Sequence, residues 1–194
     1  MTDTSNLNDP NITRCTWCGT DPLYVEYHDK EWGKPVYDDK ILFEFLILES
    51  AQAGLSWITV LRKRENYRKA FVDFDAEKIA NFSADDIERL MLDAGIIRNR
   101  QKIEAAINNA KLFLKIQEEY GSFSDYMWGF LPDKKPILNS WEQNSGLPAR
   151  TELSDRISSD MKKKGFKFFG STICYAHMQA TGMVNDHITG CISR

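Results

Sequence analysis

Four residues near the two ends of the chain have the types and spacing of metal ligands. Cys15 and His28 come early, and His187 and Cys191 come late. The late pair is four residues apart, which places both side chains on one helical face or in one tight turn. Two thiolates and two imidazoles form a closed tetrahedral zinc site, the pattern of structural rather than catalytic zinc. We therefore expect a structural Zn²⁺ ion that joins the two termini.

Other cysteine and histidine residues compete for such a site. Cys18 forms a Cys-x-x-Cys motif with Cys15, and it could replace either Cys15 or a histidine. A redox motif of this kind normally follows a strand, and none is predicted here. Cys174 and His177 are three residues apart on a predicted helix, but a free cysteine between apolar residues is more typical of a core. Structural zinc remains the favoured interpretation, with Cys18 as an open alternative ligand.

The second feature that could take part in chemistry is an acidic residue on an apolar helix face. Glu49 shares its face of the predicted helix 41–53 with Leu42 and Phe45, whereas Glu44 lies about 140° away around the axis. We expect Glu44 to point to solvent. A carboxylate on an inward face costs several kcal/mol unless it is paired or hydrogen-bonded. Glu49 is therefore either half of a buried salt bridge, a cap on a neighbouring helix, or the carboxylate of a binding pocket.

Six tryptophan and tyrosine residues, whose rings are large and amphipathic, lie before and after this glutamate in the sequence. They are Trp17, Tyr24, Tyr27, Trp32, Tyr37 and Trp57. Any one of them is more typical of a core, but as a group with one acid they could form an aromatic cage. Such a cage stacks a flat ring and attracts a positive one. We therefore predict a pocket for a planar, cationic ligand.

The elements that must position these residues are helical. Apolar residues recur at helical spacing, and residues such as Ser83 and Gly121 mark where predicted helices begin and end. The predicted helices cover 41–53, 57–71, 76–81, 84–95, 101–120, 124–130, 154–164 and 171–181. Residues 131–150 read as an irregular connection, and no strand alternation is evident. We predict an all-α fold, with a disordered polar tail at 1–13 and a single domain of two helical lobes at 14–194.

Composition limits the classes of protein to consider. The chain has 194 residues, a net charge of −3 and 42% hydrophobic residues, which is typical of a globular domain rather than a polybasic one. No apolar run reaches the roughly 18 residues of a membrane span, and the polar start lacks an export signal. We expect a cytoplasmic monomer with no membrane association. Basic clusters at 62–69, 98–102 and 162–167 are either solvated helix faces or one phosphate-facing surface.

Several segments resemble one family closely. They are 21–33 (DPLYVEYHDKEWG), 48–61 (LESAQAGLSWITVL), 93–100 (DAGIIRNR), 164–168 (KGFKF), 172–175 (TICY) and 184–187 (VNDH). In this order they are similar to the 3-methyladenine DNA glycosylase I family, over about residues 14–191. The resemblance implies a helix-hairpin-helix glycosylase fold closed by a structural zinc. It implies Cys15, His28, His187 and Cys191 as ligands and Cys18 as a free thiol.

The resemblance also implies a reaction. The enzyme would flip 3-methyladenine out of double-stranded alkylated DNA, hydrolyse its N-glycosidic bond, and leave free base and an abasic site without cutting the strand. The base pocket would consist of Glu49, Trp17, Tyr24, Tyr27, Trp32 and Trp57. Glu49 is assigned to base recognition and electrostatics, and a role in activating water stays open.

DNA contacts follow from the same resemblance. Gly54 and Leu55 form a candidate wedge at the turn between the pocket helices. The backbone amides of Gly95 and Ile97, at a helix N-terminus, are candidate phosphate donors together with Arg98 and Arg100. Other classes stay open: a catalytically silent zinc-stapled DNA-binding module, a metal hydrolase with catalytic zinc, and a glycosylase for another alkylated base.

Overall fold

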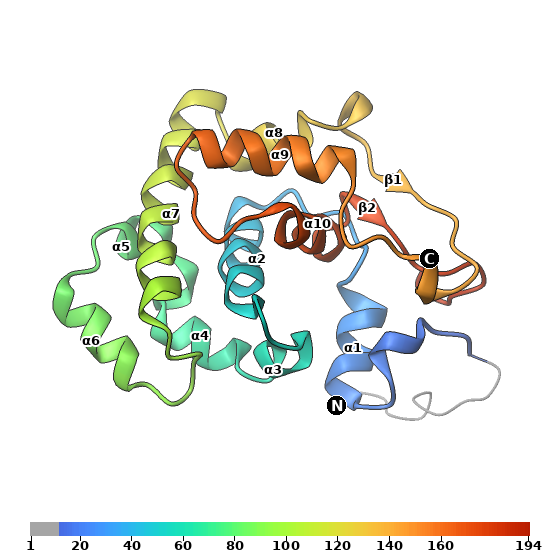
Figure 1. Ribbon diagram of the computed structural model, residues 1–194, viewed down its shortest axis with the longest axis horizontal. Helices are drawn as coiled ribbons and strands as arrows, with labels where there is room; N and C mark the ends of the chain where they lie inside the picture. The colour runs from blue at the N-terminus through green and yellow to red at the C-terminus, as the bar shows by residue number, and fades with distance from the viewer. Residues whose placement is uncertain (1–11) are drawn as a thin grey trace.

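The computed structural model describes residues 12–194, so nearly all of the predicted tail at 1–13 lies outside the described residues. The described chain is mainly helical (Figure 1). Its α-helices are α1 (Pro22–Lys30), α2 (Asp39–Gln52), α3 (Trp57–Leu61), α4 (Arg64–Ala70), α5 (Ala76–Ala80), α6 (Ala84–Leu92), α7 (Arg100–Tyr120), α8 (Phe123–Trp128), α9 (Glu152–Lys163) and α10 (Ser171–Ala180). The 3-10 helices are η2 (Thr16–Cys18), η3 (Val72–Phe74), η4 (Pro132–Lys134) and η5 (Asn144–Gly146). None of these helices is long and apolar enough to cross a membrane.

Two short strands supplement the helices. β1 (Ile137–Leu138) pairs in parallel with β2 (Val184–Asn185), and an isolated bridge joins Trp141 to Ile188. The sequence analysis missed this pairing because two-residue strands carry no alternation and depend on a distant partner. The pairing attaches the irregular connection between α8 and α9 to the C-terminal segment. Thr13 also belongs to this end of the structure, since its carbonyl accepts the Ile192 amide at 3.0 Å.

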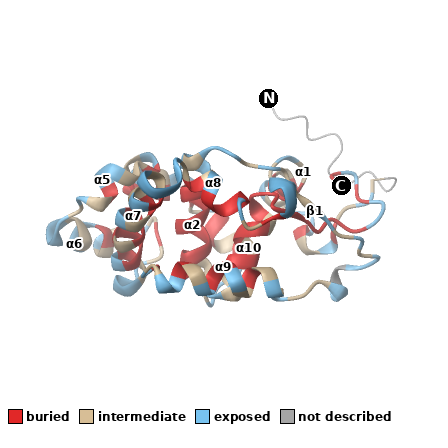
Figure 2. Cartoon of the chain, turned by 90° about the horizontal axis from the view of Figure 1, so that it is seen from above, coloured by how far each residue is buried: buried red, intermediate tan, exposed pale blue. Residues whose placement is uncertain are grey.

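Helix α2 is the centre of the molecule. Every residue from 42 to 51 is buried, and α3, α7, α8 and α10 all contact this helix. Figure 2 shows α2 and α10 as the buried middle of the cartoon. A helix that is apolar on all sides is one that the fold surrounds. Asp38 begins it by accepting the Ile41 amide at 3.0 Å.

The burial of α2 between residues 42 and 51 corrects one expectation. Glu44 does not point to solvent but is 6% exposed. Its Oε1 accepts Arg64 Nε at 2.6 Å and Arg68 Nη2 at 2.9 Å, and Arg64 also bonds Glu31 at 2.7 Å. The predicted helix 57–71 is divided at residues 62–63 into α3 and α4. Immediately after this break, Arg64 is buried against Glu44.

Helix α1 was not predicted, although its local signals are present. Asp21 accepts the amides of Leu23 and Tyr24 at 3.0 and 3.3 Å, and Pro22 occupies the first turn. An N-capping Asp followed by Pro is a standard helix start. The capping box of Ser83 and Asp86 was predicted and is confirmed. Helix α6 nevertheless ends at Leu92, before the predicted end at Gly95.

We expect the Glu44→Gln substitution to lower the free energy of unfolding by about 2 kcal/mol, because Arg64 remains buried with one charged partner fewer. Urea denaturation measures this change. The matched control is Glu65→Gln, which removes the 71%-exposed partner of Arg68. It should cost less than about 1 kcal/mol. Equal effects of the two substitutions would contradict the role of burial.

Candidate functional site

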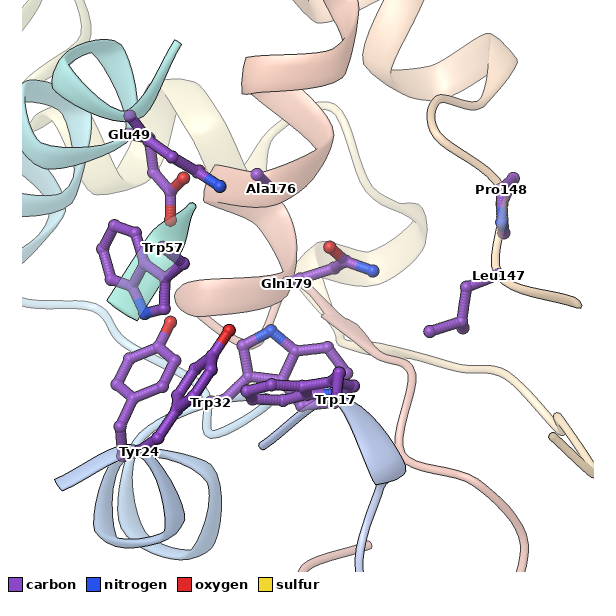
Figure 3. Close-up of a pocket in the computed structure, with 11 residues that line it drawn as sticks. Trp17, Tyr24, Trp32, Glu49, Trp57, Leu147, Pro148, Ala176 and Gln179 are labelled. Atoms are coloured by element: carbon purple, nitrogen blue, oxygen red, sulfur yellow. The ribbon is translucent and has the colours of Figure 1, made fainter. Parts of the chain in front are cut away.

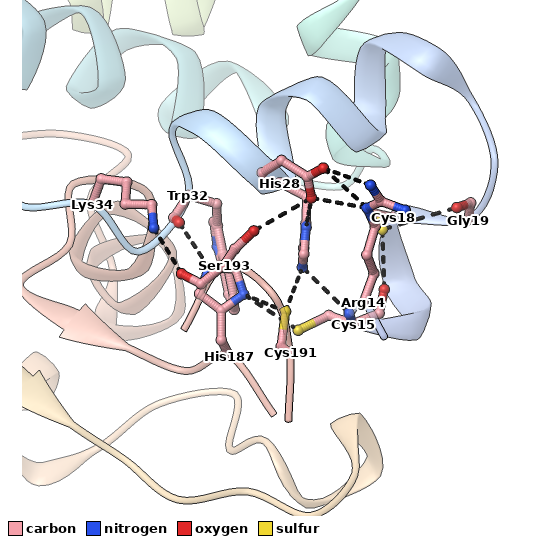
Figure 4. A network of polar contacts seen from close by, with 11 residues as sticks. Arg14, Cys15, Cys18, Gly19, His28, Trp32, Lys34, His187, Cys191 and Ser193 are labelled. Carbon is pink, nitrogen blue, oxygen red and sulfur yellow. Dashed lines mark hydrogen bonds and ion pairs between the residues drawn. The ribbon is translucent and has the colours of Figure 1, made fainter. Parts of the chain in front are cut away.

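Four side chains from the two ends of the chain meet in one buried cluster. Cys15 directly precedes η2, His28 lies on α1, and His187 and Cys191 follow β2. One ligand atom from each residue lies within 4.8 Å of the other three, and all four residues are buried (Figure 4). The chain therefore brings together the four ligands that the sequence analysis favoured.

The distances in this cluster fit a tetrahedral ion. Cys15 Sγ lies 3.6 Å from His187 Nδ1, and Cys191 Sγ lies 3.4 Å from the same atom and 3.5 Å from His28 Nε2. Sulfur and nitrogen ligands around one Zn²⁺ ion are about 3.5 Å apart, given bond lengths of about 2.3 and 2.0 Å. The four residues could thus hold a metal ion.

Outer contacts orient both histidines toward the cluster. His28 Nδ1 bonds Asp29 Oδ1 at 2.7 Å, so Nε2 is the ring nitrogen that faces the cluster, where it also accepts the Cys15 amide at 3.3 Å. His187 Nε2 bonds the Trp32 carbonyl at 3.0 Å, which leaves Nδ1. Arg14 Nε in turn holds Asp29 at 3.0 Å. Carboxylate and carbonyl partners of this kind are typical second-shell groups of metal-binding histidines.

Cys191, which belongs to the cluster, and Cys18, which lies next to it, differ in the direction of their pKa shifts. The pKa of Cys191 is lowered, first by its hydrogen bond with Cys15 and then by those with His187 and His28, so it favours the thiolate that binds metals. Burial raises the pKa of Cys18 to about 11. The Cys18 thiol donates to the Cys15 carbonyl at 3.1 Å and lies outside the group of four ligands. The geometry therefore does not support Cys18 as an alternative ligand.

A cavity of about 300 Å³ lies beside this cluster (Figure 3). Its lining includes all six residues predicted for a pocket, namely Trp17, Tyr24, Tyr27, Trp32, Glu49 and Trp57. The lining also includes residues that the sequence analysis missed: Gln52, Leu147, Pro148, Ala176 and Gln179. Gln52 is three residues after Glu49 and so on the same helical side, a signal that was available. The other four come from distant segments whose approach only the tertiary fold determines.

The rings pack against one another and against the metal cluster. The Trp17 ring centroid is 4.9 Å from that of Trp32 and 5.0 Å from that of Tyr24. Trp32 is also 4.7 Å from the His187 ring, so the cluster supports one pocket wall. Tyr37, grouped with these rings in the sequence, is 55% exposed and stacks on Trp128 instead. It does not line the pocket.

Glu49 is the unusual group in this cavity. Its side chain comes from α2, the residue is 2% exposed, and Oε2 has no hydrogen-bond partner among the described residues. Burial raises its pKa to about 8. The indole Nε1 atoms of Trp17 and Trp57 are also buried and without partners in the described chain. Unsatisfied buried polar atoms around one cavity indicate a ligand that completes their hydrogen bonds.

The predicted DNA-contact residues divide into two groups. Gly54 has φ +82° and Leu55 is 41% exposed, so the turn after α2 presents a side chain to solvent. Both predicted amide donors have partners within the chain, because Gly95 N donates to Asp93 at 2.7 Å and Ile97 N to Tyr67 Oη at 3.2 Å. Both precede α7, which begins at Arg100.

The basic residues of the same turn are exposed. Arg100 pairs with Glu88 at 2.7 Å, whereas Arg98 has no ion pair within residues 12–194. Arg98 is therefore the better placed of the two to meet an external phosphate.

We expect Cys191→Ser to lose bound metal and Cys18→Ser to retain it, since only Cys191 belongs to the tetrahedral group. Elemental analysis of each purified variant, with a thermal melt, measures both outcomes. Loss of metal from the Cys18 variant alone would contradict this ligand assignment.

A second prediction concerns Glu49 and pH. Between the usual pKa of 4.5 and about 8, the unfolded chain releases a proton that folded Glu49 keeps. The free energy of unfolding should therefore fall with rising pH across this window, by roughly 4 kcal/mol, and level off above it. Glu49→Gln should lack this component. Urea denaturation of both proteins at pH 5 and pH 8 tests it, and parallel pH dependences would show that Glu49 is solvated.

Comparisons with known proteins agree with this geometry. The family model described as methyladenine glycosylase matches residues 17–194. The chain is 52% identical over 180 residues to DNA-3-methyladenine glycosylase 1 of Escherichia coli (strain K12), which covers 93% of this chain and 96% of the relative.

Two solved structures are similarly close. A crystal structure of 3-methyladenine DNA glycosylase I superimposes with a TM-score of 0.90 at 50% identity, covering 93% of this chain and 98% of that one. The Staphylococcus aureus enzyme, solved to explain 3-methyladenine recognition, has a TM-score of 0.90 at 41% identity, covering 94% and 97%. The chain belongs to the methyladenine glycosylase family.

Proposed function

We propose that this protein is a DNA-repair glycosylase that releases 3-methyladenine from alkylated double-stranded DNA. The observation that carries the proposal is the unpaired, buried carboxylate of Glu49 facing a cavity walled by aromatic rings. The named activity of the relatives supports the same substrate.

The chemistry of the substrate matches these groups. Methylation at N3 makes adenine cationic and a good leaving group, so the glycosidic bond is already weakened. Electron-rich rings attract such a cation more than neutral adenine. A carboxylate accepts the exocyclic amine proton and forms a strong charge-assisted hydrogen bond. The empty pocket holds Glu49 largely protonated near neutral pH, and a bound cation favours its ionised form.

The proposed reaction is hydrolysis. The bond between N9 and C1′ breaks and its electron pair leaves with the base, which departs as neutral 3-methyladenine. A water oxygen bonds to C1′, and its proton passes to solvent, leaving an abasic site. Glu49 holds the base and stabilises the positive charge, and binding energy supplies the orientation. No lysine is assigned to a Schiff base, so we propose no strand cleavage.

The base must leave the duplex to reach the cavity. A damaged base is the least costly to extrude. Leu55, exposed next to Gly54 in the turn after α2, is our candidate wedge for filling the vacated space. Helices α6 and α7, joined by the turn at 93–99, are the proposed helix-hairpin-helix element, with Arg98 at the phosphate surface.

Zinc is the ion that we propose for the Cys15, His28, His187 and Cys191 cluster. The donor set and the spacing of about 3.5 Å suit it. Four protein ligands leave no open position for water, so the ion would supply cohesion rather than chemistry. It would join η2 and α1 to the C-terminal segment.

We expect Glu49→Gln to lower kcat/KM for 3-methyladenine release roughly 100-fold, because a neutral amide cannot stabilise the cationic base. Chromatography of bases released from N-methylated duplex DNA measures this rate. Glu77→Gln, which removes one exposed carboxylate on α5, is the matched control and should match wild type.

Metal content and the melting temperature check that the Glu49 variant remains folded. If the folded, metal-loaded wild type leaves 3-methyladenine in the DNA, the protein is not this glycosylase. A silent DNA-binding module would then take its place.

A further inference from the structure

A second buried carboxylate, that of Asp186, lies next to the pocket but belongs neither to its lining nor to the Cys and His cluster. Asp186 is fully buried, and all four groups that contact its oxygens are donors. Oδ1 accepts Asn139 Nδ2 at 2.6 Å and Trp141 Nε1 at 2.8 Å. Oδ2 accepts Tyr175 Oη at 2.6 Å and Gln179 Nε2 at 2.8 Å. A carboxylate with both oxygens engaged in this way is fully satisfied and fixed in place.

This arrangement determines which end of the Gln179 amide bonds Asp186 and which end is left for another partner. The amide oxygen cannot replace Nε2 beside Asp186, because two acceptors would then face each other. The main chain of Gln179 is held as well, since its carbonyl accepts the Gly33 amide at 2.9 Å. Gln179 therefore cannot flip its amide without losing the bond to Asp186.

The oxygen of this amide is free for a ligand. Oε1 has no donor among the described residues, and Gln179 lines the same cavity as Glu49. Figure 3 shows the amide between Ala176 and Leu147, with its nitrogen on the Leu147 side and its oxygen on the opposite side. The pocket thus contains a hydrogen-bond acceptor whose orientation is enforced from outside it.

A fixed acceptor distinguishes purines by their six-position substituent. Adenine carries an amine there, which donates, whereas guanine carries a carbonyl, which only accepts. A site built to receive a donor rejects an analogue without one, because its own polar group is left unpaired.

We propose that Gln179 is a specificity-determining residue that favours N3-alkylated adenine over N3-alkylated guanine, and that Asp186 is its positioning residue. This inference rests on the glycosylase function proposed above. In this proposal Gln179 on α10 selects the base by a hydrogen bond, whereas Glu49 on α2 stabilises its positive charge.

The test is the ratio of kcat/KM for release of 3-methyladenine and 3-methylguanine from the same methylated duplex DNA. We expect Gln179→Met, which keeps the side-chain length but removes the acceptor, to lower this ratio about tenfold, equivalent to about 1.4 kcal/mol of discrimination. Asp186→Asn releases the amide orientation, and we expect the ratio to fall in the same direction. A merely structural role would slow both bases equally and leave the ratio unchanged.

Gln117→Met on α7 is the matched control, because Gln117 also donates its amide to a carboxylate, Asp39 at 2.6 Å, but does not line this cavity. Its ratio should stay within about twofold of wild type, well below the tenfold change expected at Gln179. An unchanged ratio in a folded Gln179→Met, or an equal change in Gln117→Met, would overturn the inference. Failure of wild type to release 3-methyladenine would instead overturn the proposed function, so the two failures are distinguishable.

Discussion

The burial of α2 from residue 42 to residue 51 is the constraint on which the rest of the structure depends. A helix enclosed on every side can carry a carboxylate only if that charge is paired, hydrogen-bonded or neutralised. The two glutamates of α2 show two of these outcomes. Glu44 is paired with Arg64 and Arg68, whereas Glu49 faces a cavity and has an unpaired oxygen. The same residue type on one helix is thus paired with two arginines at one position and lines a cavity at the other.

The pocket is rigid because each wall is fixed by something outside it. The Trp32 ring lines the cavity and its carbonyl bonds His187, so Trp32 connects the pocket to the Cys and His cluster. Gln179 is held by Asp186, and Glu49 is held by the core around α2. Preorganised groups of this kind need no rearrangement when charge appears in the ligand. Precise recognition here is a property of the surrounding shell.

Local patterns predicted most of the helices, because spacing and capping are sequence properties. They also singled out the Cys and His residues that the fold brings into one cluster and the rings that line the cavity. Tertiary contacts were not predictable in the same way. Glu44 looked solvent-facing because only the fold brings Arg64 inward. The Ile97 amide looked free because its partner, the Tyr67 hydroxyl, lies 30 residues away in the sequence. The sequence did not indicate that Gln179 lines the cavity, and the orientation of its amide depends on a contact with Asp186 that only the fold creates. Pro22 marked a helix start that was overlooked.

The separation of the ligands along the chain has a consequence for biosynthesis. Cys15 and His28 emerge from the ribosome long before His187 and Cys191, so a growing chain holds only half of the cluster. Long-range contacts of this kind form late in folding. Trp17 and Trp32 therefore lack their support until the last ligands have been synthesised. The wall of the cavity that Trp17 and Trp32 form is therefore completed only after translation has passed residue 191.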